Sequence, residues 1–252
     1  MMSTFTIYMH QLNRIWAIAK KNIRIYYAKG PVVIFGILLP VFLFLSFIIG
    51  RQLSAAVMIP GLLGMAIFFT ANAISPAVAP WETQARTLER LMSSPVTIPT
   101  IVLGDILASF IFGVAISLVP LAIGLALGVS IAAPFILALA IVLAAICFSS
   151  LGLMFSALPT SQPSNVMMLS SVIKFPLVFI SGVFIPLSEL PTWGRVISYI
   201  SPLTYFVDIS RHLMQGIGQI SLAWDFILLL AFTLLFTFLA IVLHQRTMPR
   251  RI

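Results

Sequence analysis

Six long apolar segments constrain the fold of this chain more than any other feature of its sequence. Each is long enough to cross the ~30 Å hydrocarbon core of a bilayer as a helix, which takes about 20 residues. The segments are Val32–Ile49, Val57–Val78, Ile101–Val129, Pro134–Leu158, Val166–Ile185 and Phe226–Leu243. An open sheet would leave peptide groups unpaired in lipid, and the alternating segments of a barrel are not visible. The sequence therefore predicts an all-α integral membrane protein with six transmembrane helices.

The composition of the chain also requires a membrane environment. Hydrophobic residues make up 61% of the 252 residues and charged residues only 8%. Because soluble domains carry about 25% charged residues, lipid must cover much of this surface. No long polar segment divides the chain, which predicts a single transmembrane domain over residues 1–252. The net charge of +8 comes from cations beside the apolar segments, where they act as topology signals and do not indicate nucleic-acid binding.

Aromatic and basic residues predict the orientation of the chain. All four tryptophans and all five tyrosines lie outside the six segments, as expected for rings that prefer the headgroup level. If the N-terminus is cytoplasmic, the outer side holds only Arg51, Arg195 and Arg211. The inner side then holds Arg14, Lys20, Lys21, Arg24, Lys29, Arg86, Arg90, Arg246, Arg250 and Arg251. This excess of inner cations places both termini in the cytoplasm. The first segment exceeds the 7–15 apolar residues usual in a cleaved leader, so we expect an anchor.

Residues 1–30 predict an amphipathic helix that lies in the cytoplasmic interface. Apolar residues recur at steps of three and four and form one face: Phe5, Tyr8, Leu12, Ile15, Trp16, Ala19, Ile23 and Tyr26. Four of the cations crowd the rest of the helix, where anionic headgroups would attract them. A helix that binds a soluble partner remains the alternative.

The segment between the second and third predicted spans contains a short charged helix. Glu82 and Arg86 are spaced i,i+4 and Arg86 and Glu89 are spaced i,i+3, and both spacings favour a helix. An apolar stripe accompanies them: Ala85, Leu88, Leu91 and Met92. Two interpretations stay open. The helix could rest on the bilayer surface, or it could present its charges and a small apolar knob to a cytoplasmic partner.

Residues 186–223 are too apolar for a solvated loop and too interrupted by proline to span. One short helix is predicted after Pro191 and a second over Leu203–Gln215. Asp208 and Arg211 are spaced i,i+3, which favours an ion pair on the second helix. The pattern predicts a re-entrant helical hairpin that dips into the outer leaflet between spans five and six.

Two motifs resemble those of type-2 ABC exporter permeases. The first is Thr87-Leu88-Glu89-Arg90-Leu91 with Ser94-Pro95. The second comprises Gly182-Val183-Phe184-Ile185-Pro186, Leu190-Pro191-x-Trp193, Ser201-Pro202-Leu203-Thr204-Tyr205, Asp208 and Arg211. The resemblance covers the whole chain, because this family also has six spans, an interfacial N-terminal helix and both termini inside. The chain is most similar to the short drug-export kind.

The resemblance implies a permease subunit in the plasma membrane of a prokaryote that exports a hydrophobic or amphipathic substrate. It implies partner ATPase subunits that bind ATP and Mg, no cofactor on this chain, and a second permease copy in a homodimer or heterodimer. No G-x-x-x-x-G-K-[ST] phosphate loop occurs in the sequence, so ATP hydrolysis needs the partner chain. One departure is Gly104-Asp105, where such permeases often have Gly-Lys, and it leaves the role of Asp105 open.

The resemblance also assigns roles to two sets of residues. Residues 82–92 would form the coupling helix seated on the ATPase, with contacts carried by Glu82, Arg86, Leu88, Glu89, Arg90 and Leu91. The outer hairpin would gate the pathway through Pro186, Pro191, Trp193, Pro202, Tyr205, Asp208 and Arg211.

Lys174 is the one clear charge near the middle of a predicted span. A charge there costs about 3 kcal/mol on insertion scales, so it usually faces a bundle interior or water. Ser170 and Ser181 lie on roughly the same side of the helix, which suggests a polar lining of the substrate path. The alternative is a lysine that snorkels or pairs with Asp105.

Two other classes of function are weaker matches to the sequence. A secondary carrier or channel, which needs no ATP, would show internal repeats or several buried ionisable groups. A membrane-embedded enzyme would need a convergent acid, base and nucleophile, and the sequence shows no such set. No catalytic or metal-binding residue is therefore predicted.

Overall fold

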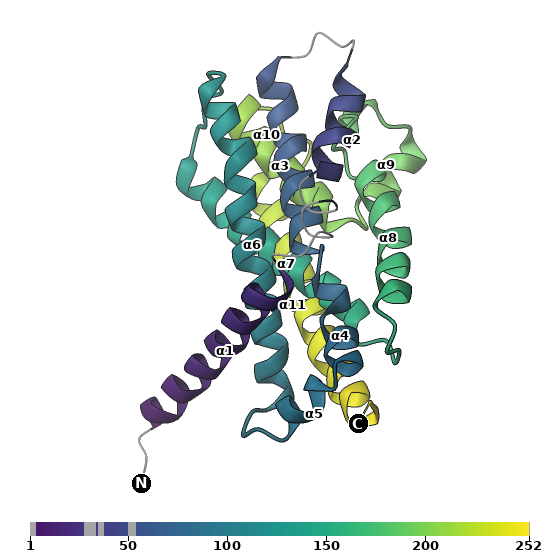
Figure 1. Cartoon of the computed structure of the whole chain (residues 1–252). Helices are drawn as coiled ribbons and strands as arrows, with labels where there is room; N and C mark the ends of the chain where they lie inside the picture. Colours follow the sequence, from purple (N-terminus) through teal and green to yellow (C-terminus); the bar gives the residue numbers. More distant parts are fainter. Residues whose placement is uncertain (1–3, 28–33, 35–37, 50–53, 252) are drawn as a thin grey trace.

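The computed structural model describes residues 4–27, 34, 38–49 and 54–251, and their regular structure is entirely helical (Figure 1). The α-helices are α1 (Thr4–Tyr26), α2 (Leu39–Ile48), α3 (Ala55–Ala71), α4 (Val78–Gln84), α5 (Thr87–Met92), α6 (Ile98–Ala126), α7 (Pro134–Ser156), α8 (Pro163–Ile180), α9 (Thr192–Ser198), α10 (Pro202–Gln215) and α11 (Leu222–Thr247). Short 3-10 turns occupy Ser75–Ala77, Leu187–Glu189 and Met248–Arg250.

Five helical stretches within the described residues are long and apolar enough to cross a membrane. They are Ala56–Gln84, Ile98–Ala126, Pro134–Ser156, Pro163–Ile180 and Leu222–Arg250. They correspond to the last five of the six predicted spans. Of the first predicted span, Val32–Ile49, most of the N-terminal half lies outside the described residues, and α2 covers the remainder. The prediction of six spans is therefore confirmed for five.

The helices form a bundle with two distinct ends. Figure 1 shows both chain termini and α5 at one end, and α9 and α10 at the other. α6, α7 and α11 pack side by side, and α3 lies against α6 and α7. The shared end of the termini and α5 agrees with the predicted topology, in which all three lie on the same side of the membrane.

Phenylalanine rings join α3, α7 and α10 in the main core. Phe68 and Phe148 meet edge to face with ring centroids 5.0 Å apart, and Phe148 meets Phe206 in the same way at 6.5 Å. All three side chains are fully buried, and such T-shaped pairs add to the free energy of burial. The helix predicted over Leu203–Gln215 is confirmed, and every residue from Pro202 to Arg211 is buried. α10 is therefore an internal element of the bundle.

The second predicted span is interrupted near its end. α3 stops at Ala71, and a 3-10 turn at Ser75–Ala77 precedes α4, so the prediction of one helix to Val78 is wrong there. Asn72 Nδ2 donates to Phe68 O at 3.1 Å and Ser75 Oγ donates to Ala71 O at 3.1 Å. These short polar side chains bind the last carbonyls of the helix and compete with its continuation.

Candidate functional site

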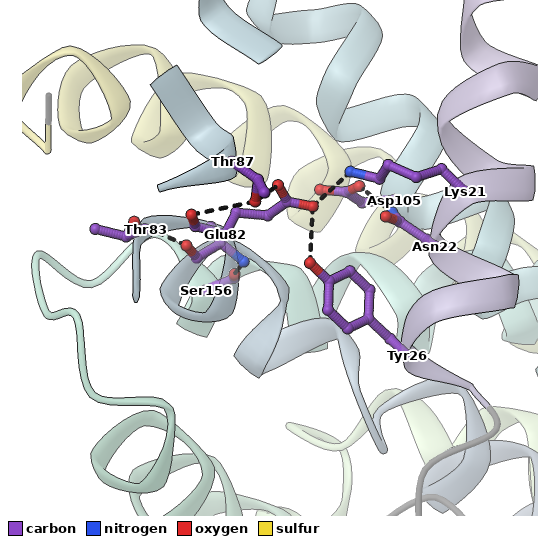
Figure 2. Close-up of polar contacts among 9 residues, drawn as sticks. Lys21, Asn22, Tyr26, Glu82, Thr83, Thr87, Asp105 and Ser156 are labelled. Carbon is purple, nitrogen blue, oxygen red and sulfur yellow. Dashed lines mark hydrogen bonds and ion pairs between the residues drawn. The ribbon is translucent and has the colours of Figure 1, made fainter. Parts of the chain in front are cut away.

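A buried carboxylate joins three helices at the end that carries α5. Glu82 on α4 is only 3% exposed. It accepts hydrogen bonds from Lys21 Nζ at 2.5 Å, from the Tyr26 hydroxyl at 2.9 Å and from Thr87 Oγ1 at 2.5 Å (Figure 2). Lys21 and Tyr26 belong to α1 and Thr87 opens α5. We call these four residues the Glu82 cluster.

Tyr26, the residue that α1 contributes to the Glu82 cluster beside Lys21, is buried. Burial, reinforced by the Glu82 charge, raises the pKa of the Tyr26 hydroxyl above its ordinary value, so Tyr26 stays neutral and donates. The Trp81 ring stacks on Tyr26 with centroids 5.3 Å apart. A cavity of about 450 Å³ lies beside the cluster and is lined partly by Lys21, Tyr26 and Glu82. This cavity leaves space between α1 and the α4–α5 corner.

A second set of polar contacts ties α1 to α6. Asn22 Nδ2 donates to Asp105 Oδ1 at 2.5 Å, and both side chains are buried (Figure 2). The hydroxyls of Tyr27 and Ser109 lie 2.5 Å apart on the same interface. The structure thus gives Asp105 a partner on α1. The alternative in which Asp105 pairs with Lys174 is wrong.

Gly104 permits the close approach of α1 and α6. A Cβ at Gly104 would lie 2.6 Å from Ile18 Cγ2, closer than real atoms approach. The predicted helix over residues 1–30 is confirmed as α1, but its apolar face is divided. Of the residues predicted for this face, Ala19 is buried, whereas Leu12 and Trp16 are 61% and 52% exposed. The outward side chains remain available to lipid, as an interfacial helix requires.

The predicted helix over residues 82–92 is two helices with a corner between them. Arg86 lies at the corner in the left-handed conformation, with φ of 54°. The i,i+4 spacing of Glu82 and Arg86 does not bring the two charges together, and Glu82 bonds instead to Lys21. α4 is also anchored by Ala79, whose backbone N–H donates to Ser156 Oγ of α7 at 3.0 Å (Figure 2).

Burial divides the predicted coupling residues into two groups. Glu82 and Leu88 are buried, and Leu91 is half-buried. Leu88 packs in a small core with residues of α1, α4, α6 and the C-terminal turn: Ile18, Ala79, Ile101 and Met248. The exposed group consists of Arg86, Glu89 and Arg90. α5 therefore presents charges outward while its other side is fixed to the bundle.

At the opposite end, Asp208 and Arg211 of α10 are buried but bind different partners. Asp208 accepts hydrogen bonds from the N–H groups of Gln219 and Ile220, at 3.0 Å and 2.9 Å for Oδ2. Arg211 Nη2 donates to Gly182 O at 2.5 Å, and burial lowers the pKa of its guanidinium. The predicted Asp208–Arg211 ion pair is therefore wrong. Each side chain instead ties α10 to a neighbouring loop.

The other predicted gate residues lie in α9 and α10 or in the segments directly before them. The Tyr205 hydroxyl donates to Tyr199 O at 2.6 Å, which links α10 to the end of α9. Pro202 opens α10, and Pro191 directly precedes α9, as predicted. The remaining two differ in exposure. Pro186 is half-buried before a 3-10 turn, and Trp193 is 69% exposed.

The three residues predicted to line the pathway are buried within the chain. Lys174 Nζ donates to the backbone oxygen of Asn72 at 3.0 Å. Ser181 Oγ donates to Val178 O at 2.7 Å, and Ser170 Oγ has no hydrogen-bond partner among the described residues. Asn72 is absent from the sequence predictions. A polar amide inside an apolar segment is the signal that could have revealed it, because such residues in spans are costly.

Comparison with known proteins agrees with this architecture. Residues 13–215 match the family described as ABC-2 type transporter. The chain is 26% identical over 194 residues to the inner membrane transport permease YadH of Escherichia coli, covering 75% of this chain and 73% of YadH. It is 23% identical to the probable multidrug ABC transporter permease YbhR of the same organism, over 66% of this chain and 46% of YbhR.

A third relative comes from a different organism. The chain is 29% identical over 134 residues to the daunorubicin resistance ABC transporter permease protein DrrB1 of Streptomyces coeruleorubidus, over 52% of this chain and 45% of DrrB1. The family match covers most of the chain and includes the Glu82 cluster, α5 and α10. The chain belongs to the ABC-2 type transporter family and is a multi-pass membrane permease.

Proposed function

We propose that this permease exports a hydrophobic or amphipathic substrate, driven by ATP that a separate ATPase subunit hydrolyses. The Glu82 cluster is the observation that carries the proposal. It links α5, whose charged side is exposed, to α1 and to the end of the α3–α4 span. The names of the relatives YbhR and DrrB1, which refer to multidrug transport and daunorubicin resistance, support efflux as the process.

The coupling step follows from the two sides of α5. Arg86, Glu89 and Arg90 would contact the ATPase, while Leu88 and Thr87 hold α5 to the bundle. A displacement of α5 would therefore act on α1 and α6 through packed side chains. ATP binding shifts the equilibrium between permease conformations only if α5 contacts the ATPase differently in each of them.

The complete transporter in this proposal contains two permease copies and two ATPase subunits. The second permease is another copy of this chain or a related one. Both termini and α5 face the cytoplasm of a prokaryotic cell, and α9, α10 and their loops close the outer end of the pathway. ATP and Mg bind to the ATPase subunits.

Co-expression with candidate ABC ATPase subunits from the same organism tests the proposal. We expect the purified complex to hydrolyse ATP faster than the ATPase alone. Arg90→Glu should weaken association about tenfold or more, because a like-charge contact costs several kcal/mol at an interface. Arg250→Glu is the matched control, since Arg250 is also exposed near the same end.

Two results would count against this proposal. One is the absence of association or of ATPase stimulation in every pairing tried with the wild-type chain. The other is an equal loss of association in Arg90→Glu and Arg250→Glu, which would indicate a general charge effect. Transport by the purified chain alone without ATP would favour a secondary carrier.

A further inference from the structure

Lys174 of α8 is a buried cation placed against the broken end of α3. Its side chain is 8% exposed, and its single hydrogen bond goes to the backbone oxygen of Asn72, 3.0 Å away. Carbonyl groups at a helix C-terminus lack helical partners and carry partial negative charge, so a cation is favoured there. This contact uses one of the three ammonium donors.

Nothing else in the described part of the chain neutralises Lys174. The ion pair in the described part of the chain joins Lys21 to Glu82 and does not involve Lys174. Asp105 is hydrogen-bonded to Asn22. Ser170, one helical turn before Lys174, has a buried hydroxyl without a partner. The Asn72 amide oxygen is turned toward α7, because a Cβ at Gly152 would lie 2.5 Å from it. A buried charge without a counter-ion is costly and attracts an anion.

A cavity of about 190 Å³ lies beside Lys174. Its walls are apolar apart from Ser171 and Lys174, and they include Phe69 and Phe175, whose ring centroids are 5.8 Å apart. Met168 on its rim is 68% exposed, so the cavity opens at the surface of α8. Sites for whole drug-sized ligands usually have about 300–1,000 Å³. This one has room for a charged head group and the first carbons of a chain.

We propose that this cavity binds the anionic head group of an amphiphile, a carboxylate or a phosphate monoester, and thereby selects anionic amphiphiles as substrates. The proposal rests on the export function proposed above and specifies its substrate class. Lys174 forms charge-assisted hydrogen bonds to the head group with its free donors. The aromatic and methionine walls contact the start of the apolar chain, and the remainder leaves the cavity past Met168.

Binding to the purified full-length chain in phosphatidylcholine nanodiscs tests this site. The probes are dodecanoate, dodecyl phosphate, dodecanol and acetate, measured by equilibrium dialysis with empty nanodiscs subtracted. Lys174→Gln removes the charge but keeps a donor for Asn72, and Lys174→Arg keeps the charge. Lys20→Gln, which removes an exposed lysine on α1, is the matched control.

We expect Lys174→Gln to bind dodecanoate and dodecyl phosphate about tenfold more weakly or worse, since charge-assisted contacts contribute roughly that factor. Lys174→Arg and Lys20→Gln should bind them as the wild type does, and dodecanol should show no dependence on Lys174. Equal dodecanoate affinity in wild type and Lys174→Gln overturns the proposal. Acetate binding as tight as dodecanoate binding overturns it too, because the site would then hold a free anion.

A competition experiment on the wild type covers the case in which Lys174→Gln does not fold. Excess dodecyltrimethylammonium should leave labelled dodecanoate bound, and its displacement would contradict an anion-selective site. The binding assay contains no ATPase. Failure of ATPase coupling with intact, Lys174-dependent binding therefore counts against the export function and leaves the anion site in place.

Discussion

At the scale of single residues, the charged side chains of this permease act by bridging helices. Glu82 is reached by donors from α1 and α5, Asp105 by Asn22 of α1, and Arg211 by the carbonyl of Gly182. Except for the bond from α5, each bond connects segments far apart in the sequence. Because a buried charge is costly without partners, these bonds fix how the helices meet.

The contribution of the Lys21–Glu82 bond to the stability of the chain can be measured by a double-mutant cycle. Glu82→Gln and Lys21→Met are each expected to lower the thermal stability of the purified chain, because the first removes the counter-ion of the half-buried Lys21 and the second leaves the buried Glu82 without its cation. The double variant should be less unstable than the two losses added together, with an interaction free energy of about 1–3 kcal/mol. Lys20→Met is the control, as Lys20 is exposed on the same helix. Strict additivity would show that the bond contributes nothing.

At the scale of elements, the spacing of apolar residues and prolines in the sequence predicted the helices well and the junctions between them poorly. The apolar segments, Pro191 before α9 and the helix after Pro202 are all visible as local patterns, because hydrophobicity and proline act within a few residues. Two partners of Glu82, Lys21 and Tyr26, lie on α1, about sixty residues earlier in the chain. Near-neighbour spacing favoured a single helix over residues 82–92 and could not show that Glu82 takes a donor from another helix.

The α1–α6 contact gives a prediction at this scale. Gly104→Ala should loosen the docking of α1, since its Cβ would collide with Ile18, and such overpacking costs about 1–3 kcal/mol. Combining it with Ile18→Ala should not restore stability, because the added Cβ would still lie 2.7 Å from the Cβ that alanine keeps. Gly194→Ala is the matched control, because a Cβ at this helical glycine of α9 meets only ordinary contacts of 3.5 Å or more. Thermal unfolding of the four proteins measures the difference. Equal midpoints for Gly104→Ala and Gly194→Ala would contradict the role of Gly104.

At the scale of the whole molecule, the two ends of the bundle differ in charge. Exposed cations lie on α1, at the α4–α5 corner and in the C-terminal turn: Lys20, Arg24, Arg86, Arg90 and Arg250. In the outer segment, Arg195 is half-buried and donates to the carbonyls of Leu187 and Ser188, and Arg211 is buried. Among these residues, the exposed cations therefore belong to elements that the predicted topology places in the cytoplasm. The positive-inside rule concerns such residues near the membrane, and the orientation inferred from the sequence stays a prediction.

Cysteine labelling of intact cells tests this orientation. The native Cys147 is fully buried and is changed to Ala to give a silent background. Ser93→Cys, at the exposed end of α5, should react with a membrane-impermeant maleimide only after the cells are lysed. Thr192→Cys, at the exposed start of α9, should react before lysis. The reverse pattern would place α5 outside, where no ATPase could reach it, and would remove the physical basis for coupling through the Glu82 cluster.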